Sequence, residues 1–296
     1  ATQIIVMHDG FSDEDARAMR RISPKVKLLP YKEDDFLRRV GGHFAETESF
    51  KRWTHMTFSR LEIFDYLAVF DRVVWLDFDT LIQGDISPMA QYAPMGMVSG
   101  STNMLYAVGS PVDGVDPETK VHGAAVMIAH RSMPWQGFTD HLYRLAAHHH
   151  ETLKLLDQAV INLGAVQRGI AISVMPDEFG CTPYWLKSRE ALIVHAFGKN
   201  RRFWNNQAVN TAFPEWSDNN AVWVSIGGTP YTGEMKNYEK APTLKGSLLQ
   251  YVDAVNLYRL IAETTFEKGG LYAPSGIGSS PITLYKHGIP KGLFSI

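Results

Sequence analysis

The sequence Val73-Val74-Trp75-Leu76 runs directly into Asp77-Phe78-Asp79. Four consecutive apolar residues bounded by polar ones predict a buried strand. Side chains two residues apart in an extended chain point to the same side, so both aspartates can face one point beyond the strand. Carboxylate oxygens suit Mg²⁺ or Mn²⁺, which proteins often hold with one or two carboxylates plus substrate phosphates. An aspartate after a strand is also common in ordinary turns, so a metal site and a simple turn both remain open here.

The chain around this strand alternates between strand-like and helix-like segments. Further strands are predicted over 4–7, 26–29, 126–129 and 170–174. Helices are predicted over 13–22 with Ser12 as N-cap, over 58–68 with Thr57 as N-cap, and over 135–147, 155–166 and 248–263. Strands that alternate with helices predict an α/β fold with a mainly parallel sheet and helices on both faces.

Composition limits the class of protein. The chain has 296 residues, of which 45% are hydrophobic and 20% charged, enough for a sizeable core and unlike a disordered chain. A formal charge of -2 gives no positive field for a nucleic-acid backbone, so no nucleic-acid partner is expected. The single cysteine, Cys181, cannot form an internal disulfide, which favours a reducing, cytoplasmic compartment. Prolines and glycines break the longest uncharged segment, 92–112, so it does not predict a membrane span.

Three segments resemble glycosyltransferase family eight, a family of retaining enzymes with the GT-A fold. The first is Thr57-Phe58-Ser59-Arg60-Leu61 with the run from Phe70 to Ile82, which contains the two aspartates. Asp157-Gln158-Ala159-Val160-Ile161-Asn162 is similar to the family's D-Q-D-x-L-N segment. The run from His195 to Phe203 is similar to its H-x-x-G-x-x-K-P-W segment. The three occur in family order, and the resemblance spans residues 3–204.

The resemblance implies a metal site and a phosphate site. Asp77 and Asp79 would hold Mn²⁺, with Mg²⁺ as the alternative, against the donor diphosphate, and His195 would be the third protein ligand. A glycine and two cations would meet the phosphates: Gly198, Lys199 and Arg201.

The resemblance also implies a pocket for the donor sugar. Arg60 would lie over the nucleotide and donor site, and Asp157 would hydrogen-bond sugar hydroxyls. Gln158 would lie on the β face of the sugar, near the anomeric carbon. His122 and Gly123 match the family's F-N-A-G segment, with histidine in place of the asparagine that contacts the sugar. This change implies an unusual donor sugar or altered sugar contacts.

Other positions depart from the family pattern. Ala159 replaces the second aspartate of D-Q-D, and Arg201-Arg202-Phe203 stands at K-P-W, where a slip of one residue would use Trp204. Arginine keeps the charge but not the compact ammonium group. The segment 4–10 matches the family's second strand, so either the first strand is expected upstream of Ala1 or the nucleotide is held differently.

The predicted function is a metal-dependent retaining hexosyltransferase that uses a nucleotide sugar such as a UDP-hexose. The acceptor would be a glycan or a lipid-linked oligosaccharide, as in polysaccharide or lipopolysaccharide biosynthesis. A non-catalytic nucleotide-sugar-binding protein of the same fold is the first alternative, because of His122, Ala159 and the unmatched first strand. A glycoside hydrolase is the second, opposed by the close spacing of the two aspartates and by the basic segment 199–202.

Two units are predicted along the chain. Residues 1–204 would form the nucleotide-sugar-binding catalytic core, and residues 205–296 a C-terminal extension with an acceptor or packing role. Near its end this extension carries only Lys286 and Lys291 as basic residues. Peripheral attachment at the inner face of the membrane is therefore kept only as an alternative to a free cytoplasmic protein.

Overall fold

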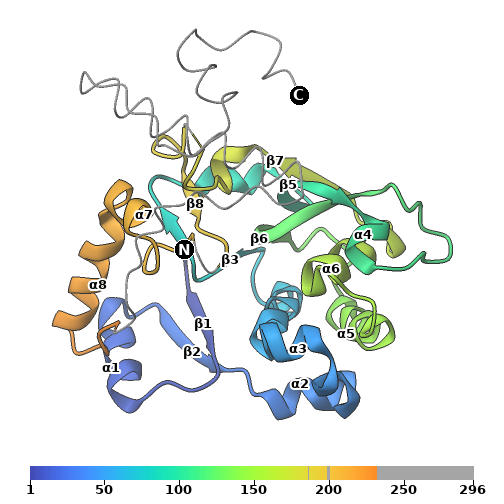
Figure 1. Cartoon of the computed structure of the whole chain (residues 1–296), viewed down its shortest axis with the longest axis horizontal. Coiled ribbons are helices and arrows are strands. Elements are labelled where there is room, and N and C mark those ends of the chain that lie inside the picture. The colour runs from blue at the N-terminus through green and yellow to red at the C-terminus, as the bar shows by residue number, and fades with distance from the viewer. Residues whose placement is uncertain (186, 199–200, 232–296) are drawn as a thin grey trace, which may run out of the picture.

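The computed structural model of the chain describes residues 1–185, 187–198 and 201–231 (Figure 1). Its strands are β1 (Ile4–His8), β2 (Val26–Pro30), β3 (Arg72–Leu76), β4 (Thr80–Ile82), β5 (Met95–Asn103), β6 (Lys120–His130), β7 (Ile172–Met175) and β8 (Ile193–His195). Its α-helices are α1 (Asp13–Ile22), α2 (Glu33–Val40), α3 (Glu48–Trp53), α4 (Met104–Val108), α5 (Phe138–His149), α6 (Leu156–Gln167), α7 (Gln207–Ala212) and α8 (Glu215–Ser225). Its 3₁₀ helices are η1 (Gly42–Glu46), η2 (His55–Ala68), η3 (Ser87–Gln91) and η4 (Asp177–Phe179).

These strands form three sheets, and their directions are mixed. β1 pairs with β2 in parallel, β4 pairs with β8 antiparallel, and a four-stranded sheet has the order β3-β6-β5-β7. Within it β5–β7 is parallel, whereas β3–β6 and β5–β6 are antiparallel. The α/β class is confirmed, but the expected mainly parallel sheet is wrong for the described strands. β6 returns beside β5 through α4 and a loop, without a helix that crosses the sheet, so the two strands run in opposite directions.

The four-stranded sheet buries both of its faces. Along β6, side chains alternate between two clusters, as the pleat of a strand requires. Met127 and Ala129 belong to the larger cluster, which includes buried side chains of α5, α6 and η2. Val126 and Ile128 pack with residues of η3, η4 and β8 on the other face. In the described residues, then, long helices cover one face, and short 3₁₀ helices with β8 cover the other.

β3 is an edge strand rather than the buried strand predicted from its four apolar residues. It pairs only with β6 among the described strands, and Val74 is 39% exposed. Val73 and Trp75 still pack against the larger cluster. The edge position leaves one side of β3 unpaired among the described strands, while the side chains of Asp77 and Asp79 after it are largely buried.

Helix starts follow local capping where the cap is strong. Ser12 caps α1 as predicted: its hydroxyl accepts a hydrogen bond from the Asp15 amide at 3.0 Å. The predicted α-helix over 58–68 is instead the 3₁₀ helix η2, which begins at His55. Thr57 is not its cap, because its hydroxyl donates to the Trp53 carbonyl at 2.7 Å. The helix predicted over 248–263 lies outside the described residues.

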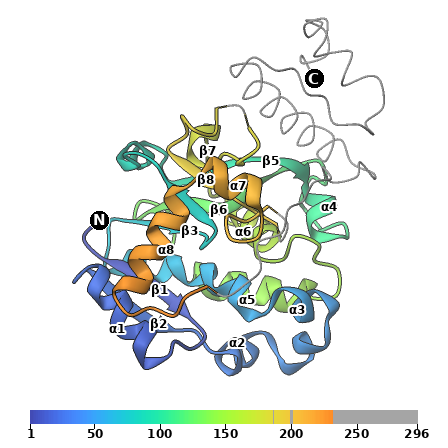
Figure 2. The ribbon, with the colours of Figure 1, turned by 60° about the vertical axis from the view of Figure 1, so that its left-hand side comes forward.

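The described end of the chain returns to its beginning, since α8 lies beside α1 (Figure 2). The Arg21 guanidinium donates to the Ile226 carbonyl at 2.8 Å, and Asp15 accepts from the Thr229 amide at 2.7 Å. The unit boundary at residue 204 stays a prediction. None of the described helices has the length and apolar character needed to cross a bilayer.

Candidate active site

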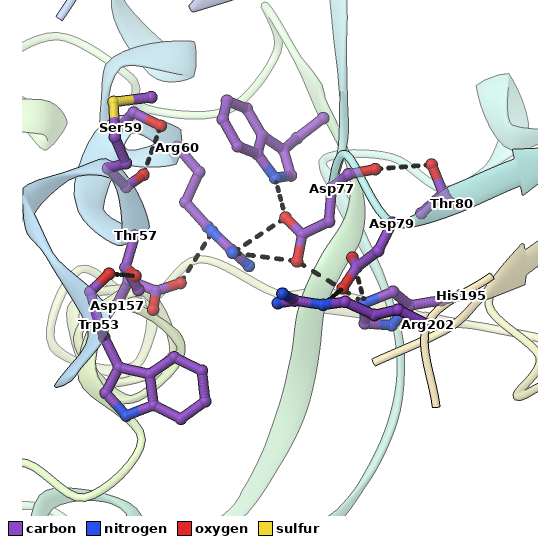
Figure 3. A network of polar contacts seen from close by, with 12 residues as sticks. Trp53, Thr57, Ser59, Arg60, Asp77, Asp79, Thr80, Asp157, His195 and Arg202 are labelled. Atoms are coloured by element: carbon purple, nitrogen blue, oxygen red, sulfur yellow. Dashed lines mark hydrogen bonds and ion pairs between the residues drawn. The ribbon is translucent and has the colours of Figure 1, made fainter. Parts of the chain in front are cut away.

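Asp77, Asp79 and His195 come together where β3 ends and β4 pairs with β8 (Figure 3). The β4–β8 ladder sets Thr80 opposite His195, which brings the imidazole to the aspartates. One candidate ligand atom from each residue lies within 4.8 Å of the others. His195 Nε2 is 3.1 Å from Asp79 Oδ1 and 3.8 Å from Asp77 Oδ2. Two carboxylates with one imidazole are a donor set that fits Mn²⁺ or Mg²⁺.

Asp77 is held in place by two neighbouring side chains. Arg60 Nη2 lies 2.9 Å from Asp77 Oδ1 and 3.1 Å from Oδ2. The Trp75 indole donates to Oδ1 at 2.7 Å. The Thr80 hydroxyl donates to the Asp77 carbonyl at 2.7 Å, which fixes the turn between β3 and β4. The carboxylate therefore has a defined orientation before any ligand binds.

Arg60 joins this cluster to Asp157 at the start of α6. Arg60 Nε lies 2.8 Å from Asp157 Oδ2, and Asp157 is only 5% exposed. Burial raises the pKa of Asp157 to about 6, although Arg60 favours its charged form. The predicted sugar-binding aspartate and the predicted donor-site arginine are thus in direct contact.

Asp79 has a different set of partners. Besides His195, it accepts a hydrogen bond from Arg202 Nε at 3.2 Å. Burial of Asp79 opposes its charge, but His195 and Arg202 outweigh burial and lower its pKa. In the sequence, Arg202 stands only at the variable K-P-W position, and its contact with Asp79 could not be predicted from that position. The pair of adjacent arginines, Arg201 and Arg202, was the signal in the sequence that pointed to a second cation here.

The residues predicted around the donor sugar are linked through Asn162. Its side chain accepts from the His122 amide at 2.8 Å and donates to the His122 carbonyl at 2.9 Å. Its amide nitrogen also donates to the Gln158 carbonyl at 2.8 Å. Asn162 thereby ties α6, which carries Asp157 and Gln158, to β6. His122 Nδ1 is buried, and burial lowers the pKa of the ring.

Ala159 and Gly123 suit the packing at their positions. Ala159 is fully buried, so an aspartate there would place a charge in the apolar core. Gly123 lies at a register shift between β5 and β6, and a Cβ on it would come within 2.8 Å of the Val98 side chain. The missing aspartate therefore has a structural reason in this chain.

The predicted phosphate-binding residues are less fully placed. Gly198 has φ +88°, a conformation that favours glycine, and a Cβ there would meet nothing within 4 Å. The Arg201 guanidinium lies over the rings of Tyr184 and Phe197, at 5.6 and 5.2 Å from their centroids. Lys199 lies outside the described residues. The contact of these three residues with phosphate stays a prediction.

The N-terminal part of the chain matches a known family. Residues 1–106 match the family described as Glycosyl transferase family 8. The match covers about a third of the chain, and over that part the chain is similar to this family. The matched segment contains Arg60 and both aspartates of the candidate metal site, and it confirms the resemblance seen in the sequence. No curated protein matches the chain.

Solved structures show which fold the chain adopts. The galactosyltransferase LgtC, solved with donor and acceptor sugar analogues, gives a TM-score of 0.55 at 14% identity and covers 77% of this chain and 86% of its own. The bifunctional glycosyltransferase WbbM gives a TM-score of 0.53 at 16% identity and covers 76% of this chain and 44% of its own. These likenesses confirm the GT-A fold.

Proposed function

We propose that this protein is a metal-dependent retaining glycosyltransferase that moves a hexose from a UDP-sugar to a glycan or lipid-linked oligosaccharide. The proposal rests on one observation: Asp77, Asp79 and His195 converge beside the Arg60–Asp157 pair. The match of residues 1–106 to glycosyltransferase family 8 and the likeness to LgtC, solved with donor and acceptor sugar analogues, support it.

The charged residues have different roles in binding a donor. Asp77, Asp79 and His195 would hold Mn²⁺ or Mg²⁺, which when bound places positive charge where the leaving diphosphate gains negative charge. Arg60 fixes the orientation of Asp77 and Asp157 relative to each other. Asp157 in its carboxylate form would accept hydrogen bonds from donor sugar hydroxyls. Arg202 neutralises Asp79 on its other side.

Retention of anomeric configuration would follow from attack on the face of the sugar that the diphosphate leaves. The bond from the anomeric carbon to the phosphate oxygen breaks, and a bond to the acceptor oxygen forms on the same face. The acceptor proton passes to the departing phosphate oxygen. Gln158 follows Asp157 on α6, and its amide is too weak a nucleophile to form a covalent intermediate. Intact-mass measurement with donor alone is expected to show no glycosyl adduct, and an adduct would contradict this route.

Release of UDP from UDP-hexoses with and without Mn²⁺ tests the function. The wild-type protein is expected to hydrolyse its donor slowly and only with metal. Asp79→Asn should lower this rate by about 100-fold or more, because it removes one charged ligand. Asp71→Asn is the matched control, since Asp71 is an exposed aspartate before the same strand.

The outcomes separate the alternatives. Full activity in Asp79→Asn would contradict the metal site. Tight Mn²⁺-dependent binding of UDP-hexose with no hydrolysis and no transfer would favour a non-catalytic binding protein. Cleavage of aryl glycosides without nucleotide would favour a glycoside hydrolase.

A further inference from the structure

Phe78 stands between two of the three candidate metal ligands, and its ring faces solvent. It is 75% exposed, the highest value among the large apolar side chains of the described residues. Single exposed apolar side chains are common on protein surfaces. This one differs in its place, because Asp77 and Asp79 are its neighbours on either side in the chain.

Other aromatic rings support Phe78 from behind. It stacks on Trp204, with ring centroids 5.5 Å apart and 30° between the planes. Trp204 contacts Trp216 at 5.9 Å and Tyr231 at 6.4 Å, and these two rings are 6.1 Å apart. The Tyr231 hydroxyl donates to Asn205 Oδ1 at 2.8 Å. We call Phe78, Trp204, Trp216 and Tyr231 the aromatic platform; its inner rings hold Phe78 in place and leave much of its ring uncovered.

Arg202 connects the aromatic platform to the candidate metal site. Its guanidinium lies 5.1 Å from the Phe78 ring centroid and 5.4 Å from that of Trp204. Its Nε donates to Asp79 at 3.2 Å. A cation over aromatic faces, bound to a metal-ligand carboxylate, suits a ligand that joins a planar ring to phosphates.

The order of the polar contacts indicates in which order the parts of a bound donor would lie along the site. Polar contacts run from Asp157 through Arg60 to Asp77, across His195 to Asp79, and on to Arg202 (Figure 3). In the proposed function, the sugar lies at Asp157 and the diphosphate at the metal ligands. The third part of the donor, the nucleoside, then extends toward Arg202 and Phe78.

We propose that Phe78, backed by Trp204, stacks on the nucleobase of the donor. This inference rests on the proposed function and adds the specificity element for the nucleoside end. A base stacked on an aromatic side chain binds through its π face, so the contact favours a nucleotide over a bare diphosphate.

Calorimetric titration with two ligands tests the inference. Each protein is titrated with UDP and, separately, with inorganic pyrophosphate, both in the presence of Mn²⁺. Phe78→Ala is expected to bind UDP about 5- to 140-fold more weakly and to bind pyrophosphate as the wild type does. Phe78→Tyr keeps the ring and should keep the UDP affinity. Tyr106→Ala is the control, because Tyr106 is an exposed aromatic residue on α4 that takes no part in the site.

The results distinguish this inference from the proposed function. Unchanged UDP affinity in Phe78→Ala overturns this inference and leaves the proposed function standing. The same holds if acceptor binding falls while UDP affinity is unchanged. An equal loss for UDP and pyrophosphate overturns it too, because Phe78 would then act on the metal site and not on the base. Absence of Mn²⁺-dependent binding of both ligands to the wild-type protein overturns the proposed function and this inference with it.

Discussion

Arg60 binds two carboxylates that lie far apart in the sequence. Its guanidinium contacts Asp77 after β3 and Asp157 on α6, and all three side chains are largely buried. A planar guanidinium has donors enough for both partners, which the single ammonium of lysine would not match. Removing one member of such a cluster leaves buried charge without compensation.

Arg60→Gln is therefore expected to lower the free energy of unfolding by about 3–5 kcal/mol. Urea unfolding of this variant, of Asp157→Asn and of the double variant measures the coupling between them. The free energy of unfolding of the double variant should fall by less than the sum of the decreases in the two single variants. Strict additivity would contradict a direct pair. Arg17→Gln, which breaks an exposed pair with Glu14, should leave the free energy of unfolding nearly unchanged.

Asp157 makes stability depend on pH. Its pKa is raised by burial from the usual 3.8 to about 6, so the folded protein binds this proton more tightly than the unfolded chain. The extra stability that the folded protein gains from protonated Asp157 is fully present below pH 3.8, and it is lost as pH rises through about 6. Between pH 4 and pH 7 the free energy of unfolding of the wild type should fall relative to that of Asp157→Asn, which cannot titrate at this position. The expected change in this difference is on the order of 2 kcal/mol. A difference that stays constant with pH would contradict this assignment.

At the scale of elements, residues with positive φ lie at the start of both elements that carry this pair. Thr54 and Leu156 are the two non-glycine residues with positive φ in the described part of the chain. Thr54 directly precedes η2, which carries Arg60, and Leu156 directly precedes Asp157. At φ 62° and ψ 167°, Thr54 occupies a region that is nearly restricted to glycine.

Thr54→Gly is expected to raise the free energy of unfolding by about 1 kcal/mol, because relief of strain exceeds the entropy cost of glycine. Thermal unfolding measures the change. Thr57→Gly is the matched control and should lower stability, since it lies inside η2 and its hydroxyl donates to the Trp53 carbonyl. Destabilisation by Thr54→Gly would show that Thr54 is not strained.

At the scale of the whole molecule, the candidate site joins elements that are distant in sequence. η2, the β3–β4 turn and α6 each contribute charged side chains, and the end of β8 contributes the His195 imidazole. A ligand that binds these residues together binds only the folded chain, so its binding energy adds to stability.

Mn²⁺ with UDP should therefore raise the unfolding temperature of the wild-type protein. At one hundred times the dissociation constant, the expected gain is about 2.7 kcal/mol. A chelator should remove the gain, and Asp79→Asn should not show it. The same thermal unfolding assay is applied to Asp79→Asn. An equal rise in its unfolding temperature would mean that the ligand binds elsewhere.

The sequence alone determined the features that neighbouring residues encode. The strand before Asp77, the Ser12 cap and the residue types of the candidate metal site could be predicted, because periodicity and capping depend on residues a few positions apart. The resemblance of three short segments extended this to Arg60, Asp157 and His195, which the structure brings into one network.

Only the tertiary structure decided strand direction and side-chain partners. The antiparallel return of β6, the edge position of β3 and the contact of Arg202 with Asp79, 123 residues away, do not follow from any local pattern. The exposure of Phe78 is of the same kind, because an aromatic residue after a buried strand would ordinarily be assigned to the core. Such features depend on which distant segments pack together, and packing energy is shared among residues that no short window of sequence contains.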